Sequence, residues 1–128
     1  MFADTKAFSG FAAPDIAQAK QFYGDTLGIK VTEEYGLLTL HLNGGDRPTL
    51  IDPKPDPEPA GFTILNFEVE DVEEAVDELN ARGVTMEKYE GFDQDEKGIA
   101  RGEGPDIAWF KDPAGNVLSV VEADSRTS

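Results

Sequence analysis

The 128-residue sequence contains no cysteine, one histidine and one tryptophan. Without cysteine the chain can form no disulfide and offers no thiolate as a metal ligand or nucleophile. No apolar run approaches the roughly eighteen residues that span a membrane, and the first residues lack the basic and apolar regions of a secretory signal. We therefore expect a cytoplasmic protein with no membrane partner.

Basic residues are also scarce. The chain has 11 lysines and arginines against 26 aspartates and glutamates, which gives a formal net charge of −15. A protein that binds nucleic acid needs a basic surface, so this charge excludes nucleic acid as a partner. The excess acid either attracts cationic ligands or serves solubility, and its spread along the whole chain favours solubility. The apolar fraction of 39% is enough for the core of one average domain.

The most distinctive stretch, residues 111–121, predicts a tight hairpin between two apolar strands. Asp112 and Pro113 open the turn, because proline presets φ for the second position of a turn. Gly115 accepts the positive φ that such turns need. Residues 107–110 form the strand before the turn, and residues 117–121 form the strand after it.

The sequence repeats one order of elements. Asp15 begins a helix that Gly28 ends, and Asp71, 56 residues later, begins a helix that Gly83 ends. One strand precedes each helix and three follow it; the predicted strands are residues 6–13, 29–32, 37–42, 48–52, 62–69, 84–89, 107–110 and 117–121. This predicts a single α+β domain of two tandem βαβββ modules, at about residues 6–53 and 61–123. The proline-rich residues 53–60 form an extended linker between them.

Two motifs resemble those of a known family. The opening residues are Phe8, Pro14-Asp15-Ile16, Ala19, Phe22-Tyr23 and Leu27-Gly28, and the closing residues are Trp109-Phe110-Lys111-Asp112-Pro113-Ala114-Gly115-Asn116. Both resemble the vicinal oxygen chelate superfamily, which includes glyoxalase I, extradiol dioxygenases, fosfomycin-resistance enzymes and bleomycin-resistance proteins. The resemblance implies a cup-shaped mixed sheet with helices on its outer face, a small ligand in the cup and frequently a homodimer.

The resemblance also implies where a metal would bind. In metal-dependent members, four histidine, glutamate or glutamine side chains reach into the cup, one from each of four strands. The matching positions in this sequence are Phe8, Thr39, Ile64 and Ser119. Divalent metals need imidazole, carboxylate or amide ligands, so we expect no metal and no cofactor at the usual site.

His41 leaves three roles open. Strand alternation places it with Thr39, while Glu68 shares a face with Ile64 and Asn66. His41 is hydrogen-bonded or exposed, contacts a ligand in the cup, or belongs to a nonstandard metal site with Glu68. The serines lie in no nucleophile elbow, so we assign no catalytic residue.

Alternation predicts a largely apolar and aromatic cup, as a pocket for an organic molecule requires. The predicted ligand-binding residues are Phe8, Thr39, His41, Ile64, Asn66, Glu68, Ile107, Trp109 and Ser119, with Gly10, Ala12, Val117 and Val121 on the same faces. Trp109 either stacks on an aromatic or cationic ligand or packs in the core beside Phe110. The loop of residues 90–105 is a lid or a dimer contact, and its acidic residues 93–96 hold a cationic group or are solvated.

We therefore expect a metal-independent small-molecule-binding protein of the bleomycin-resistance type. Such a protein would confer antibiotic resistance by sequestering a drug, or would sequester an aromatic or cationic metabolite. Two alternatives stay open. One is a lyase, isomerase or dioxygenase with a nonstandard metal site, and the other is an interaction module without a small ligand.

Overall fold

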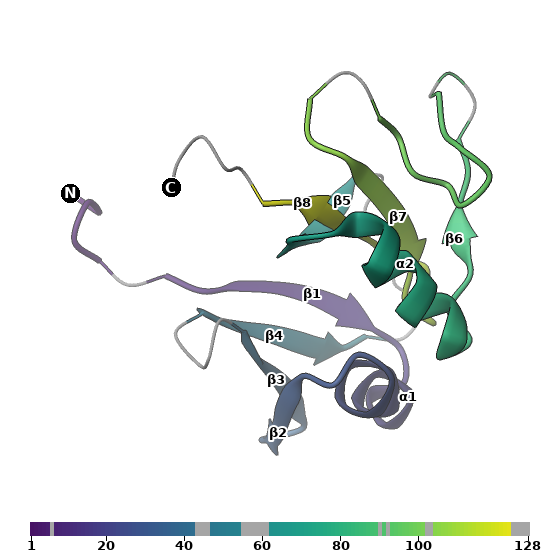
Figure 1. Cartoon of the computed structure of the whole chain (residues 1–128). Coiled ribbons are helices and arrows are strands. Elements are labelled where there is room, and N and C mark those ends of the chain that lie inside the picture. Colours follow the sequence, from purple (N-terminus) through teal and green to yellow (C-terminus); the bar gives the residue numbers. More distant parts are fainter. Residues whose placement is uncertain are drawn as a thin grey trace. The chain divides into compact units, whose positions relative to one another are not determined.

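A computed structural model describes residues 1–5, 7–42, 47–54, 62–89, 91, 93–101 and 104–123 (Figure 1). The chain divides into two compact units, Met1–Glu58 and Pro59–Ser128. The predicted turn at residues 43–45 and most of the predicted linker lie outside the described residues. That both units form one domain around a shared cup stays a prediction.

The first unit contains a four-stranded mixed sheet with strand order β1-β4-β3-β2. Strands β1 and β4 are parallel and the other neighbours are antiparallel. The elements are β1 (Ser9–Ala13), α1 (Ile16–Lys20), the π-helix η1 (Gln21–Thr26), β2 (Lys30–Glu34), β3 (Leu37–Leu42) and β4 (Arg47–Pro53).

The second unit repeats this arrangement with strand order β5-β8-β7-β6, and its outer pair β5 and β8 is again parallel. Its elements are β5 (Thr63–Val69), α2 (Val72–Ala81), β6 (Met86–Glu87), β7 (Ile107–Lys111) and β8 (Val117–Glu122). The predicted α+β class and the repeated βαβββ order are confirmed. Among the described residues, no helix is long and apolar enough to cross a membrane.

Both helices begin at the predicted aspartates. The Asp15 carboxylate accepts a hydrogen bond from the backbone N–H of Gln18 at 3.0 Å, and Asp71 accepts one from Glu74 at 3.2 Å. Each bond satisfies a backbone donor that has no partner inside the helix. Gly28, after the first helix, has a φ of 73°, which residues with a side chain rarely adopt.

The first helix differs from the uniform α-helix that the spacing predicts. It continues from α1 into the π-helical η1, whose wider turn changes which side chains lie on the packed face. Tyr23 is fully buried there, and the Phe22 ring packs edge-on against it with ring centroids 5.1 Å apart. The apolar spacing left Phe22 and Tyr23 as alternatives, and the structure buries Tyr23.

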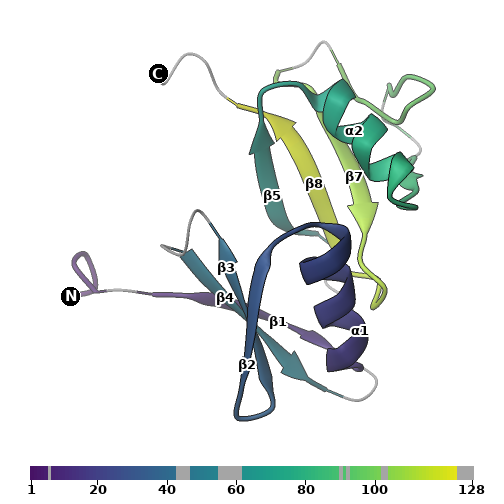
Figure 2. The same ribbon diagram turned by 60° about the horizontal axis from the view of Figure 1, so that its bottom comes forward.

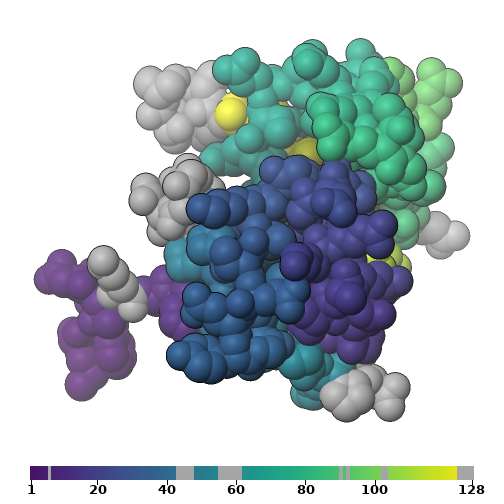
Figure 3. Space-filling model, turned by 90° about the horizontal axis from the view of Figure 1, so that it is seen from below, coloured from purple at the N-terminus to yellow at the C-terminus, as the bar shows by residue number. Residues whose placement is uncertain are grey.

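Each helix covers one face of the sheet in its own unit (Figure 2). In the first unit Leu38, Leu40 and Ile51 are fully buried on that face. In the second unit the buried face presents Ala108, Phe110, Leu118 and Val120, and α2 contributes Val72, Val76 and Leu79. On the outer side of the first unit, the atoms from α1 through β2, coloured purple to blue, form a continuous surface (Figure 3).

The closing hairpin is built by one buried aspartate. The Asp112 carboxylate accepts hydrogen bonds from the backbone N–H groups of Ala114 at 3.0 Å and Asn116 at 2.8 Å, and from the Asn116 side chain at 3.0 Å. Gly115 has a φ of 92°. The sequence prediction of this turn is confirmed.

The two units differ in the connection before the closing hairpin. Their helices start 56 residues apart, at Ile16 and Val72, whereas β3 and β7 start 70 residues apart, at Leu37 and Ile107. The second unit therefore has 14 additional residues between β6 and β7. We call residues 88–106 the insert; in the first unit a two-residue turn, Tyr35 and Gly36, makes the same connection.

Two predicted strands are shorter in the structure. The strand predicted at residues 84–89 is reduced to Met86–Glu87, because the chain leaves the sheet there to form the insert. The strand predicted at residues 6–13 begins only at Ser9, where pairing with β4 begins, so Phe8 lies just before it.

Candidate functional site

The uncovered face of the second sheet carries most of the predicted site residues of that unit. Strand pairing sets Asn66 beside Ser119, and Ser119 beside Trp109, in one row across the sheet. The Ser119 hydroxyl donates a hydrogen bond to Asn66 Oδ1 at 2.6 Å and is fully buried. The next row holds Glu68, Val121 and Ile107. These rows lie opposite the helix-covered face, as alternation predicts.

Ile64 does not follow that alternation. Thr63 pairs with Val117 and Leu65 pairs with Leu118, so Ile64 is an additional residue in a β-bulge. A bulge leaves the extra residue unpaired and turns the strand locally. The prediction that Ile64 continues the row of Asn66 is therefore wrong, and Thr63 takes that place opposite Val117.

In the first unit, Thr39 and His41 lie on the sheet face opposite Leu38 and Leu40, as predicted. His41 Nε2 lies 2.8 Å from Thr32 Oγ1 on the neighbouring strand, so the histidine is hydrogen-bonded within the sheet. Phe8 is 66% exposed. The part of the chain that the structure describes has no group of three or more histidine or acidic side chains that could hold a metal ion.

A groove of about 490 Å³ lies within the second unit. Its floor includes Ile107 and Trp109 of β7, which the sequence predicts, while five of the seven lining residues belong to the insert. The lining residues are Gly91, Asp93, Ala100, Arg101, Pro105, Ile107 and Trp109. The sequence analysis missed the role of Arg101, because only the folded insert brings it beside β7.

Trp109 packs against the insert and not beside Phe110, whose side chain lies on the helix-covered face. The rings of Trp109 and Tyr89 meet edge-on, with centroids 5.7 Å apart and planes at 76°. Burial, and then the negative charge of Glu87, raise the pKa of Tyr89. Tyr89 is thus neutral at physiological pH, and the pair forms an uncharged aromatic wall.

The insert is a folded segment held by backbone and side-chain hydrogen bonds. The Gln94 side chain accepts from the backbone N–H of Tyr89 at 2.8 Å and donates to the carbonyls of Glu87 at 3.1 Å and Gly98 at 2.7 Å. Ala100 pairs through its backbone with Ile107, and Ile99 is fully buried. These contacts fix the wall of the groove next to β7.

Asp95 organises the turn of the insert. Its carboxylate accepts hydrogen bonds from the backbone N–H groups of Lys97 at 2.9 Å and Ile99 at 3.0 Å, and from the Arg101 side chain at 3.2 Å. Burial alone would raise the pKa of Asp95, but these hydrogen bonds outweigh burial and hold the pKa below its ordinary value. The acidic stretch that was expected to hold a cationic group thus binds the chain's own Arg101.

Comparison with known proteins identifies the family. Residues 8–120 match the model of the Glyoxalase/Bleomycin resistance protein/Dioxygenase superfamily, and the chain belongs to this superfamily. No sequence among the curated proteins matches the chain.

Several solved structures share the fold. A glyoxalase family protein from Enterococcus faecalis is 26% identical, with 95% of this chain and 100% of that chain covered and a TM-score of 0.66. The antibiotic-binding protein TnmS3 from a Streptomyces species is 24% identical, with 93% and 97% covered and a TM-score of 0.68. A lactoylglutathione lyase from Agrobacterium tumefaciens is 21% identical, with 93% and 94% covered and a TM-score of 0.67.

Proposed function

We propose that this protein binds a small organic molecule in the groove of its second unit, without a metal and without breaking a bond. The observation that carries the proposal is the pairing of Trp109 with a groove of about 490 Å³. Pockets for drug-sized ligands measure about 300 to 1,000 Å³ and combine apolar walls with a few polar groups. Here Trp109, Ile107, Ala100 and Pro105 are the apolar part, and Asp93 and Arg101 are the charged part.

Charge favours a cationic aromatic ligand. The chain carries a net charge of −15, so cations are concentrated near its surface. Asp93 is exposed at the groove, whereas the charge of Arg101 is balanced by neighbouring carboxylates. A planar cation that stacks on Trp109 would gain from the ring face and from Asp93 together.

Binding with sequestration is the role that the groove's lining supports. None of its seven residues is a serine, threonine or histidine that could act as a nucleophile or general base. TnmS3 is named as an antibiotic-binding protein, which is a precedent for such binding on this fold. A drug or an aromatic cationic metabolite is the proposed ligand.

Other parts of the proposal extend beyond the groove. Asn66, Glu68 and Ser119 share a sheet face with Ile107 and Trp109, and we include them as polar contacts for a larger ligand. Contacts from Phe8, Thr39 and His41 stay predictions, since these residues belong to the first unit. Metal independence, a homodimer and a cytoplasmic location also stay predictions.

The single tryptophan makes the proposal directly testable. Trp109 fluorescence would be followed while three probes are added: proflavine, a planar aromatic cation; Nile red, which is uncharged; and 1-anilinonaphthalene-8-sulfonate, an anion. We expect saturable quenching in that order of decreasing affinity. If none of the three probes quenches Trp109 saturably, the proposal is wrong.

A matched pair of variants tests the charge argument. Asp93→Asn removes a carboxylate at the groove, and Asp4→Asn removes one in the first unit with the same change in net charge. We expect Asp93→Asn to weaken proflavine binding by about threefold and to leave Nile red unchanged. Equal effects of the two variants would show that only the overall charge matters.

A further inference from the structure

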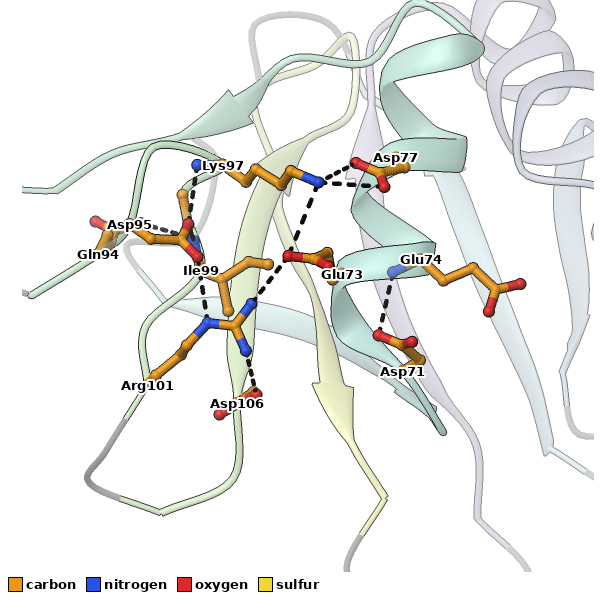
Figure 4. Close-up of polar contacts among 11 residues, drawn as sticks. Asp71, Glu73, Glu74, Asp77, Gln94, Asp95, Lys97, Ile99, Arg101 and Asp106 are labelled. Atoms are coloured by element: carbon orange, nitrogen blue, oxygen red, sulfur yellow. Dashed lines mark hydrogen bonds and ion pairs between the residues drawn. The ribbon is translucent and has the colours of Figure 1, made fainter.

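Arg101 lines the groove and also joins the insert to helix α2 (Figure 4). Its Nε lies 3.2 Å from Asp95, one terminal nitrogen lies 3.0 Å from Asp106, and the other lies 3.5 Å from Glu73. Each nitrogen of the guanidinium thus meets a different carboxylate. A planar guanidinium can do this, whereas the single ammonium of a lysine cannot match the three directions.

The three carboxylates come from three parts of the structure around the groove. Asp95 holds the turn of the insert, Asp106 precedes strand β7, and Glu73 lies in the first turn of α2. The backbone carbonyl of Asp106 also accepts a hydrogen bond from the N–H of Glu122 at the end of β8. Arg101 therefore joins the insert, the groove's floor and the helix at one point.

Lys97 makes a second connection between the insert and α2. Its ammonium lies 2.9 Å from Asp77 and 3.8 Å from Glu73 (Figure 4). Together the two cations meet four carboxylates, so the cluster carries an excess of negative charge. Loss of Arg101 would leave Glu73, Asp95 and Asp106 near one another without the cation that they share.

We propose that Arg101 is a positioning residue of the groove, which keeps the insert against α2 and β7 by balancing these three carboxylates. The proposal rests on the proposed function for its effect on a ligand, but its effect on the insert can be measured without one. Arg101 binds no ligand group in this role. Its consequence is that even an uncharged ligand binds with an affinity that depends on ionic strength.

Salt dependence distinguishes this role from ordinary packing. A single exposed ion pair contributes little, and the Arg101 side chain is 45% exposed, so salt screens the cluster. In the wild type, salt weakens the attraction between Arg101 and its carboxylates and loosens the insert. In Arg101→Gln, the remaining force among the three carboxylates is repulsion, and salt therefore tightens the insert. The two proteins should respond in opposite directions.

The first measurement needs no ligand. Hydrogen exchange of the amides in residues 94–101, and acrylamide quenching of Trp109, would be recorded from about 0.01 M to about 1 M salt. The matched control is Arg82→Gln, which removes the same charge from an ion pair with Glu78 at 3.0 Å, on α2 and outside the groove's lining. We expect faster exchange and stronger quenching in Arg101→Gln at low salt, a smaller change in Arg101→Lys and none in Arg82→Gln.

The second measurement uses Nile red, because an uncharged probe feels no direct attraction to Arg101. We expect Arg101→Gln to bind it about threefold to tenfold more weakly than the wild type at low salt, with recovery as salt rises. The proposal is overturned if Arg101→Gln matches Arg82→Gln in exchange, or if Nile red binds both variants equally. If exchange responds as expected but no probe binds even the wild type, the proposed function fails while the role of Arg101 in ordering the insert stands.

Discussion

The two units use the same chemistry to begin their helices and different chemistry to connect the later strands. Asp15 and Asp71 make equivalent caps, and both sheets have a parallel outer pair. The first unit then makes a tight turn in which Tyr35 has a φ of 55° and Gly36 a φ of 78°. The second unit has the insert in place of that turn. The repeated elements determine the fold, and the added residues form the groove.

The uncovered sheet faces differ in the same way. In the first unit, polar side chains such as Thr32 and His41 are hydrogen-bonded to one another across the strands. In the second unit, Trp109 lies under the insert and packs on Tyr89. An aromatic surface beside a hollow suits an organic ligand, whereas a hydrogen-bonded polar row offers it little. This contrast locates the proposed site in the second unit.

Removing the insert should have the largest effect. Deletion of residues 91–104, with Pro105→Asn and Asp106→Gly, would give the second unit a two-residue turn of the kind found in the first. It removes or replaces five of the seven lining residues, so we expect proflavine binding to fall below detection. Stability should fall by about 2–5 kcal/mol through the loss of buried Ile99.

Circular dichroism and fluorescence anisotropy of proflavine would check this outcome. The strand and helix signals should persist, because the other elements of the repeat are unchanged. A folded deletion protein that still binds proflavine with wild-type affinity would contradict the assignment of the groove to the insert.

Two neighbouring residues of β7 should separate stability from binding. Phe110 is 1% exposed on the helix-covered face, so Phe110→Ala should lower the free energy of unfolding by about 3–5 kcal/mol. Trp109→Ala should cost less stability but weaken proflavine binding by about tenfold, since it removes the stacking surface. Urea unfolding and proflavine anisotropy measure the two effects.

The control for this pair is Tyr35→Ala, which removes a 97% exposed aromatic ring from the first unit. We expect it to leave proflavine binding unchanged. Equal losses of binding in Trp109→Ala and Tyr35→Ala would mean that the probe adheres to exposed aromatic rings in general.

The helix caps should give the smallest and most symmetric effects. Asp15→Ala and Asp71→Ala each remove one hydrogen bond to a helix N-terminus, and each should lower the free energy of unfolding by about 1 kcal/mol. Urea unfolding of both variants is the measurement. A much larger loss in one unit would show that its helix relies on the cap more than the repeat implies.

Local signals in the sequence account for much of the fold. The two caps and the Asp112 turn depend on residues within four positions of each other, so they could be predicted correctly. Alternation also placed Trp109 and Ile107 on the uncovered face. The extra residue at Ile64 and the π-helical turn at Tyr23 were missed, since neither interrupts the apolar pattern.

The groove itself depends on contacts between distant residues. Gln94 reads as an ordinary polar loop residue, yet its side chain bonds to the backbone of Tyr89 and Glu87. Arg101 is joined to Glu73, which is 28 residues away in the sequence. No local pattern identifies such partners. The comparison of the two repeats does reveal the insert, because the helices and the later strands are spaced differently.

The most direct test maps a bound probe on each unit. Backbone amide spectra of isotope-labelled protein would be recorded by nuclear magnetic resonance during a titration with proflavine, together with the indole N–H of Trp109. Binding in the groove predicts that shifts concentrate in residues 93–101, in β7 and at the indole. Shifts centred on Thr39 and His41, with Trp109 unperturbed, would contradict the central claim that the insert creates the binding site.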